Sequence, residues 1–271
     1  MKKVFNKVTV IMMVATAILA SCKKGDYHNG GHDGGHGKPD PDANSVVVSA
    51  AGDSAGIVAK LNELRLLLGD PVNVAPGATG GRREINWDAV PPAFTNNNNF
   101  PFDFFGSFDP VLPNGRKRGL IYANTGTTLR VDSTDFADID ASYASQFEPF
   151  SRKRLFTSIG TNVTEITFKV PGTNTNGFVK GFGVIFSDVD IAYNTSVEYY
   201  NGNKSLGIFK ATAAPQGFSL LGVSFPYEKV TRVKITSGNG ILGAGVKDVT
   251  NGGPYDLVVM DDFFYDEPKA L

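Results

Sequence analysis

Residues Phe178 to Phe186 read FVKGFGVIF, and this stretch decides the fold expected for the chain. Bulky residues at 178, 182, 184 and 186 alternate with valine, isoleucine and two glycines, which is the period-2 pattern of a β-strand. Glycines have no side chain, so one face of this strand carries aromatic rings while the other lets a neighbouring segment approach closely. We therefore expect a central strand of a sheet.

Related patterns extend outward from this strand. After Gly80, turn residues recur about every ten positions between short apolar runs, which is typical of an all-β sandwich or barrel. Ile166 and Phe168 alternate with polar residues, which predicts a strand with one solvated face. The 20 phenylalanines are expected to fill a core between two sheets. Further strands are expected at residues 118–123, 127–132, 197–200, 205–209, 218–225, 231–236 and 256–265.

One helix is predicted ahead of these strands, between Asp53 and Gly69. Its apolar residues recur at helical spacing, Asp53 or Ser54 is suited to cap its start, and Gly69 with the following Asp-Pro pair ends it. We expect residues 49–80 to form an accessory helix and a connector, and residues 81–271 to form the sandwich domain. The apolar stripe consists of Ile57, Leu61, Leu64 and Leu68.

The N-terminus has the pattern of a lipoprotein signal. Three lysines precede an apolar run of about a dozen residues, which is short for a membrane span, and small residues then lead to Cys22. We expect residues 1–21 to be a signal peptide and Cys22 to be acylated, so that the exported protein is held at the bacterial outer membrane or cell surface. An uncleaved anchor helix is the alternative. Residues 22–48, rich in glycine, histidine and aspartate, are expected to form a flexible tether.

Composition excludes several kinds of chemistry. The only cysteine and all three histidines lie within the first 36 residues, so the folded body lacks the side chains for cysteine nucleophiles, Ser-His-Asp hydrolysis and zinc thiolate or imidazole sites. Loss of residues 1–21 would remove three lysines and no acid, which changes the formal net charge from −1 to −4. We interpret the basic groups at 116–118 and 152–154 as solvated surface charge, and we expect no nucleic-acid partner.

Five aspartates are candidate ligands for a metal ion. A carboxylate in an apolar strand is costly to bury unless it is hydrogen-bonded, paired or bound to a cation. Oxygen ligands without histidine or cysteine favour Ca²⁺. The alternative is that these acids cap turns or pair with basic residues such as Arg82, Arg83, Arg232 or Lys234. The candidates are Asp188 and Asp190 at the end of one strand, and Asp256, Asp261 and Asp262 in the last strand, where the adjacent 261 and 262 are expected to point to opposite faces.

The sequence GGRREINWD at 80–88 contains the candidate ligand-binding residues Glu84, Trp87 and Asp88. Trp87 is the only tryptophan, and an exposed tryptophan beside acids is able to stack on a sugar ring. The alternative is a core tryptophan whose N–H finds an acceptor.

Several motifs together resemble a family of bacterial exported proteins of unknown function whose members often carry a C-terminal PEP-CTERM sorting anchor. The resemblance extends over about residues 50–268 and implies a secreted, jelly-roll-like antiparallel β-sandwich, with no catalytic residues to carry over. This chain differs in its anchor, which we expect to be the lipid on Cys22. The matching motifs are Gly81–Asp88, Phe100-Pro101 with Phe104-Phe105, Arg118–Leu120, Phe182–Asp190, Leu221–Phe225 and Val259–Phe263.

Three functions are compatible with these features. The favoured one is a non-catalytic binding sandwich for an extracellular glycan or another polymer, attached to the bilayer through Cys22 and stabilised by Ca²⁺. The second is a structural component of the envelope or matrix with no small ligand. The third is a glycoside hydrolase or lyase, because two carboxylates suffice for that chemistry. The carboxylate pairs that it would use combine Glu84 or Asp88 with Asp188, Asp190 or Asp262.

Overall fold

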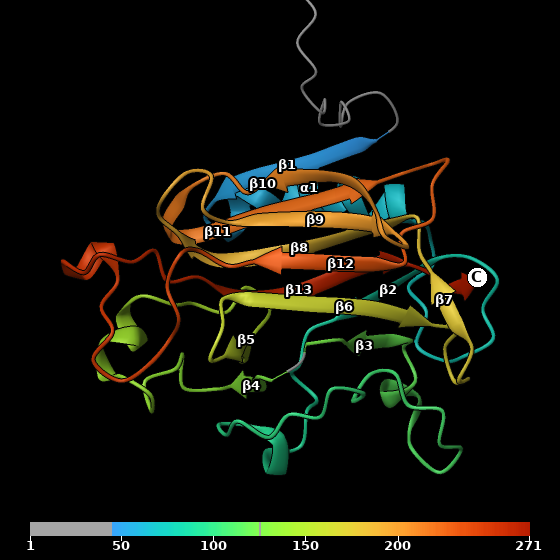
Figure 1. The fold of residues 1–271 in the computed structure, drawn as a ribbon, viewed down its shortest axis with the longest axis horizontal. Coiled ribbons are helices and arrows are strands. Elements are labelled where there is room, and N and C mark those ends of the chain that lie inside the picture. Colours follow the sequence, from blue (N-terminus) through green and yellow to red (C-terminus); the bar gives the residue numbers. More distant parts are fainter. Residues whose placement is uncertain (1–44, 125) are drawn as a thin grey trace, which may run out of the picture. The chain divides into compact units, whose positions relative to one another are not determined.

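The computed structural model describes residues 45–124 and 126–271, which form two antiparallel sheets packed face to face and one α-helix (Figure 1). The first sheet has the order β1 (Val46–Gly52), β11 (Ala214–Ser224), β8 (Gly181–Val189), β13 (Val259–Asp266), β5 (Leu155–Ile159) and β4 (Thr128–Asp132), with β2 (Arg82–Ile85) also paired to β13. The second has the order β10 (Lys204–Lys210), β9 (Ser196–Asn201), β12 (Arg232–Thr236), β6 (Val163–Lys169), β7 (Asn176–Phe178) and β14 (Lys269–Ala270), with β3 (Leu120–Tyr122) paired to β6. The expected jelly-roll-like β-sandwich with one accessory helix is thus confirmed.

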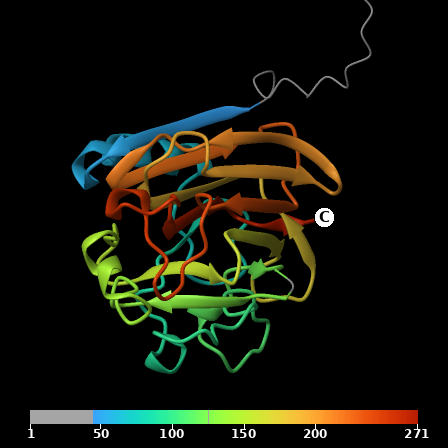
Figure 2. The ribbon, with the colours of Figure 1, turned by 60° about the vertical axis from the view of Figure 1, so that its left-hand side comes forward.

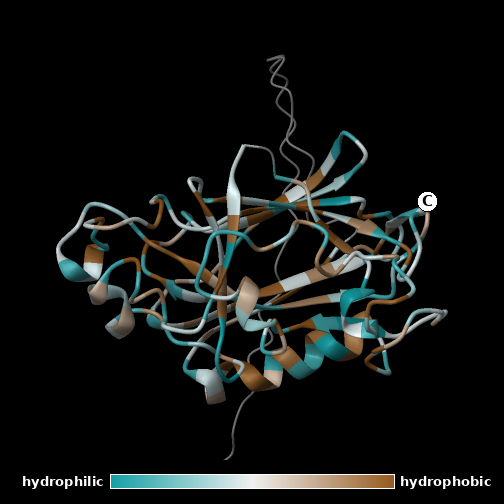
Figure 3. Cartoon of the chain, turned by 90° about the horizontal axis from the view of Figure 1, so that it is seen from below, coloured by the Kyte–Doolittle hydropathy of each residue, from teal (hydrophilic) through white to brown (hydrophobic). Residues whose placement is uncertain are grey.

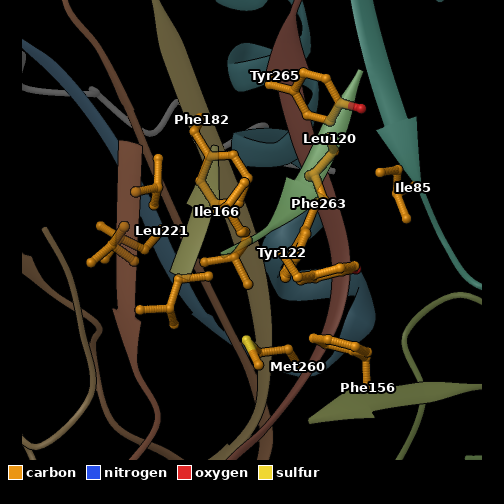
Figure 4. Close-up of a cluster of buried hydrophobic side chains, with 14 of the residues drawn as sticks. Ile85, Leu120, Tyr122, Phe156, Ile166, Phe182, Leu221, Met260, Phe263 and Tyr265 are labelled. Carbon is orange, nitrogen blue, oxygen red and sulfur yellow. The ribbon is translucent and has the colours of Figure 1, made fainter. Parts of the chain in front are cut away.

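The main core lies between the two sheets and is rich in aromatic rings (Figure 4). Strand β8 supplies Phe182, Val184 and Phe186 to this core, as the alternation predicts, while Ile185 faces the other way. The prediction that residues 178–186 form one continuous strand is wrong at its start. Phe178 ends β7 in the second sheet, and the chain crosses to the first sheet before β8 begins.

Helix α1 (Ser54–Leu68) packs on the outer face of the first sheet. Asp53 caps its start by accepting a hydrogen bond from the Gly56 N–H, and Gly69 ends it at a φ of 104°, where a side chain would be strained. Its buried residues are the four of the predicted stripe. Figure 3 shows both hydrophilic and hydrophobic residues along this helix.

Three glycines on the outer face of the first sheet let α1 approach closely. We call Gly181, Gly183 and Gly222 the glycine platform. A Cβ atom added at Gly222 or Gly183 would lie 2.5–2.6 Å from a methyl group of Leu64, and one at Gly181 would lie 2.6 Å from Leu68. The close approach expected from the glycine pattern is therefore confirmed, and the approaching segment is α1.

Strand β1 corrects the expected limit of the tether at residue 48. It begins at Val46 and pairs along its length with β11, beside which it forms the edge of the sheet (Figure 2). Val48 is the only buried residue of this strand, so its sequence does not show the alternation of apolar and polar residues that predicts a strand. None of the helices formed by the described residues has the length and apolar character needed to cross a bilayer. The predicted signal peptide, Cys22 and most of the tether lie outside those residues.

The last long strand also differs from its prediction. It begins at Val259 rather than Asp256, and its register against β8 shifts between Met260 and Phe263. This β-bulge places one extra residue on β13, which breaks the strict alternation of side chains between the two faces.

Candidate functional sites

The first candidate site is a group of aspartates at one end of β8, which we call the acidic cluster. Asp188 and Asp190 lie at the end of β8, Asp248 precedes a short 3₁₀ helix (Val249–Asn251), and Asp256 precedes β13. One carboxylate oxygen from each of Asp188, Asp190 and Asp248 lies within 4.8 Å of the others. Two oxygens bound to one Ca²⁺ at about 2.3–2.6 Å are at most about 5 Å apart, so this spacing fits a shared cation.

Backbone N–H groups hold three of these four carboxylates in place, those of Asp188, Asp248 and Asp256. Asp256 accepts hydrogen bonds from Asp190 N at 3.0 Å and Ile191 N at 3.2 Å. Asp248 accepts from Thr250 N at 2.7 Å and Leu257 N at 2.8 Å. These bonds join the segments after β8 and before β13, so the carboxylates converge because two loops meet at one end of the sheet.

Three oxygens of the acidic cluster lack a hydrogen-bond partner among the described residues. Asp188 is fully buried, and its Oδ1 accepts from Gln216 N at 2.7 Å, while no described residue donates to its Oδ2. Neither carboxylate oxygen of Asp190 has a donor in that part of the chain. Among the described residues, no lysine or arginine forms an ion pair with any of the four aspartates. Of the alternative, in which these acids pair with basic residues or cap turns, the first part does not hold for Asp188, Asp190 or Asp256, and the second holds for Asp256.

Crowding of carboxylates changes their proton affinity. Burial, the Asp248 carboxyl group and the charge of Asp188 raise the pKa of Asp190 to about 8. Burial, opposed by the Gln216 hydrogen bond and reinforced by the charge of Asp248, raises the pKa of Asp188 to about 6. The acidic cluster therefore needs a positive charge near neutral pH, which a proton or a metal ion would supply.

Asp261 and Asp262 lie away from the acidic cluster and do not point to opposite faces. The Ser151 hydroxyl lies 3.2 Å from Asp261 Oδ1 and 2.6 Å from Asp262 Oδ1, so the two carboxyl groups share its one proton, because the bulge in β13 brings them to the same side. Asp261 also accepts from Ser151 N at 3.0 Å. Burial and the adjacent Asp262 raise the pKa of Asp261, and burial raises the pKa of Asp262 to about 6. This pair anchors the chain near Ser151 and is no part of the acidic cluster.

Glu84, Trp87 and Asp88 do not form one site. The Glu84 carboxylate points to the helix side of the first sheet, where Arg65 binds it in a bidentate ion pair at 2.8 and 3.0 Å and Arg82 binds it at 2.7 Å. Asp88 is half-buried, and burial raises its pKa against the opposing effect of a backbone hydrogen bond from Lys153.

Trp87 is a core residue and not an exposed platform, as the alternative predicted, but the acceptor that the alternative gave to its N–H is not found among the described residues. It is 1% exposed, stacks on Phe156 with ring centroids 4.9 Å apart, and meets Phe263 edge to face. Its Nε1 lacks a geometrically good hydrogen-bond acceptor in the described part of the chain.

The second candidate site is a cavity of about 380 Å³ beside this tryptophan, which we call the Trp87 pocket. The end of β2 and the turn that follows it, residues 85–87 and 89–91, form one side of the pocket. Residues 104–105 and four residues between 113 and 118 form the other side. Aromatic and aliphatic side chains make up most of the wall, and Asn86 and two arginines are its polar members. The lining residues are Ile85, Asn86, Trp87, Ala89, Val90, Pro91, Phe104, Phe105, Pro113, Gly115, Arg116 and Arg118.

The basic group at 116–118 is not simple surface charge, contrary to its interpretation from the sequence. Lys117 is 9% exposed and donates to the Pro110 carbonyl, and the guanidinium of Arg116 lies 3.7 Å from the centre of the Phe104 ring. Burial lowers the pKa of Arg118. Sequence reasoning missed the roles of these arginines and of Asp248. The only local signal for Asp248 was its residue type, because aspartate is a favoured residue at the position that caps the start of a helix. A capping side chain accepts a hydrogen bond from the backbone N–H two or three residues later, which here is that of Thr250.

Comparisons with known proteins add little to this picture. No protein-family model matches the chain, and no curated protein matches it. Among solved structures, a tyrosine-to-alanine mutant from a study of ligand recognition by family 29 carbohydrate-binding modules is 8% identical, with a TM-score of 0.30 over 69% of this chain and 93% of that one. An aspartate-to-alanine mutant from the same series is 8% identical, with a TM-score of 0.30 over 70% and 87%. Such values identify neither the family nor the ligand of this chain.

Proposed function

We propose that this protein is a non-catalytic binding module of the bacterial cell envelope that holds an extracellular glycan in the Trp87 pocket. The pocket itself carries the proposal, because its volume of about 380 Å³ is within the range of small-ligand sites, about 300–1,000 Å³. Its aromatic and aliphatic wall suits the apolar C–H face of a sugar ring. Asn86, Arg116 and Arg118 supply hydrogen-bond donors for sugar hydroxyls.

Binding without cleavage is favoured by the lining of the pocket. Glycosidic cleavage ordinarily needs two carboxyl groups on either side of the bond, and the described residues that line the Trp87 pocket include no aspartate or glutamate. Four of the five carboxylates proposed for a hydrolase are engaged elsewhere, and the fifth, Asp88, lies beside the pocket wall with no second carboxyl group among the described lining residues. Two arginines hold Glu84, Asp188 and Asp190 belong to the acidic cluster, and Ser151 binds Asp262.

Filling the pocket is expected to abolish glycan binding while the protein stays folded. A Cβ atom added at Gly115, in the pocket wall, meets no atom within 4 Å, so Gly115→Phe introduces a ring without backbone strain. Titration calorimetry of the purified full chain against a panel of soluble oligosaccharides should give a ligand whose affinity falls at least about tenfold, or 1.4 kcal/mol, in this variant.

Gly80→Phe is the matched control, because a Cβ atom there also meets nothing within 4 Å and Gly80 lies outside the pocket. Both variants should melt close to the parent protein, and the bound oligosaccharide should be recovered intact. The proposal fails if no saccharide binds, if both glycine variants bind as the parent does, or if the ligand is cleaved.

The acidic cluster is proposed to hold Ca²⁺ and thereby to join the segments after β8 and before β13. The unpartnered Oδ2 of buried Asp188 and the unpartnered oxygens of Asp190 support this role, since a hard divalent cation takes carboxylate oxygens as ligands. Asp248 completes the proposed set in place of the predicted Asp261 and Asp262.

Saturating Ca²⁺ is expected to raise the melting temperature of the full chain, relative to excess chelator, by about 5–10 °C. A free concentration of 100 times the Kd stabilises a folded protein by about 2.7 kcal/mol, and each kcal/mol corresponds to about 2–4 °C for a domain of this size. Asp190→Asn should remove the shift, whereas Asp262→Asn, outside the acidic cluster, should keep it. A midpoint unchanged by Ca²⁺ in the parent protein would rule out the metal.

The same melts should depend on pH with a defined sign. Asp190 keeps its proton in the folded protein up to about pH 8 but loses it near its ordinary pKa when unfolded, so stability without Ca²⁺ falls as pH rises from about 4 to 8. Ca²⁺ binds the deprotonated carboxylates, so its effect on the midpoint should be larger at pH 8.5 than at pH 5.

Acylation of Cys22 is proposed as the attachment of this module to the outer membrane or cell surface, on the strength of the lipoprotein pattern in the sequence. A Cys22→Ala variant that stayed in the membrane fraction would contradict this attachment.

A further inference from the structure

We infer that the sugar held in the Trp87 pocket carries an acidic group, a carboxylate or a sulfate ester, and that Arg116 and Arg118 bind this group. The inference rests on the proposed function, and it adds the chemical class of the glycan. The two arginines are its structural basis.

Arg116 presents a guanidinium that is held in place but not neutralised. Its Nε donates to the Phe104 carbonyl at 2.7 Å, and its charged plane packs against the Phe104 ring. These contacts orient the group by one hydrogen bond and by a cation–π interaction. They leave the two terminal nitrogens without any hydrogen-bond partner among the described residues, available to bind a carboxylate in a bidentate manner.

Arg118 is more deeply buried than Arg116, and one of its buried N–H donors has no hydrogen-bond acceptor among the described residues. One terminal nitrogen donates to the Glu84 backbone carbonyl, while its Nε is buried and has no acceptor in the described part of the chain. A buried donor without an acceptor costs about 1–3 kcal/mol, and more when the group is charged. An acidic group in the pocket would satisfy this donor and the charge together.

No carboxylate of the described residues forms an ion pair with either arginine. Two acids adjoin the pocket wall in the sequence, Glu84 and Asp88. The alternation of β2 sends the Glu84 side chain to the opposite face, where Arg65 and Arg82 hold it. Asp88 forms no ion pair with Arg116 or Arg118, and the charges that act on it are those of residues 152–154. Asp103 influences Arg116 only as a nearby charge and forms no ion pair with it. In a chain of formal net charge −1, two unpaired guanidiniums in one apolar pocket form a local site for an anion.

The test compares ligands that differ only in charge. Calorimetry of the full chain should be run with a galacturonate oligosaccharide, with its methyl ester, and with a neutral oligosaccharide of the same size with and without sulfate esters. Binding of at least one acidic form should be ten or more times tighter than that of its uncharged counterpart, and it should weaken as NaCl rises. The two pairs distinguish carboxylate from sulfate as the recognised group.

Variants locate the effect in the pocket. Arg116→Met and Arg118→Met keep much of the side-chain volume and should each lower affinity for the acidic ligand at least tenfold more than they lower affinity for the neutral ligand, which loses only hydrogen bonds to its hydroxyls. Lys60→Met, on the exposed side of α1, removes the same charge elsewhere and should have no effect. If Arg118→Met does not fold, the affinities of Arg116→Met for the acidic and neutral ligands are sufficient to test the inference.

Two results would overturn the inference. One is equal binding of the charged and uncharged ligands, which leaves glycan binding intact but removes the acidic class. The other is unchanged affinity for the acidic ligand in the folded arginine variants. Absence of binding by every saccharide, charged or neutral, contradicts the proposed function itself and the inference with it.

Discussion

Replacement of Glu267 by glutamine is expected to lower the free energy of unfolding by about 3–5 kcal/mol, because it leaves Arg83 charged and unpaired inside the protein. Arg83 is fully buried and Glu267 is 2% exposed, and two hydrogen bonds of 2.7 Å join them in a bidentate ion pair. The pair connects β2 to the segment after β13. Urea denaturation monitored by tryptophan fluorescence should measure the loss, since Trp87 lies in the core.

Two further variants test whether the loss of stability arises from leaving a charge unpaired in a buried position. Glu165→Gln removes one partner of the Glu165–Arg232 ion pair, whose side chains are 30% and 28% exposed, and it should cost less than about 1 kcal/mol. The double variant Arg83→Met with Glu267→Met removes both buried charges and should recover most of the stability lost by Glu267→Gln. If Glu267→Gln cost no more than Glu165→Gln, the buried pair would have no special role.

Truncation of Leu64 to alanine is expected to cost about 2–5 kcal/mol, because its side chain is fully buried between α1 and the glycine platform. Gly222→Ala should also destabilise, by about 1–3 kcal/mol, since its new methyl group would lie 2.5 Å from Leu64 Cδ1. Leu66→Ala is the control on the same helix, because Leu66 is 71% exposed, and its effect should stay within about 0.5 kcal/mol.

Combining the two changes tests whether the contact is direct. Leu64→Ala removes the methyl groups that the new side chain of Gly222→Ala would meet, so the double variant should be more stable than the sum of the single effects by about 1 kcal/mol or more. Additive losses in denaturant melts would show that the glycine is required for another reason.

Local patterns were sufficient to predict most elements of the fold. The stripe from Ile57 to Leu68 and the capping Asp53 predicted α1 nearly to the residue, because helix periodicity and caps depend on neighbours in the sequence. Strands such as β6 and β12 were predicted because one of their faces is solvated and their residues alternate. Short or weakly patterned strands such as β1, β2 and β5 were missed, since pairing with distant strands stabilises them.

The candidate sites were predicted less well. Of the five aspartates predicted to bind one metal ion, Asp188, Asp190 and Asp256 lie close together. Asp261 and Asp262 form a separate pair. The bulge in β13 causes the difference, because one extra residue reverses the faces that simple alternation assigns. Asp248 was missed because it joins the acidic cluster only through the meeting of two loops.

The sequence by itself determined the class of the fold, the helix with its apolar stripe and caps, and the absence of histidine and cysteine from the described body, because each of these depends on composition or on residues a few positions apart. Only the tertiary structure decided which carboxylates share the acidic cluster and that Glu84 points away from the Trp87 pocket. It also decided that Arg116 and Arg118 line this pocket with no carboxylate partner among the described residues. The physical reason is that burial and charge pairing depend on distances between segments far apart in the chain, which no local pattern records.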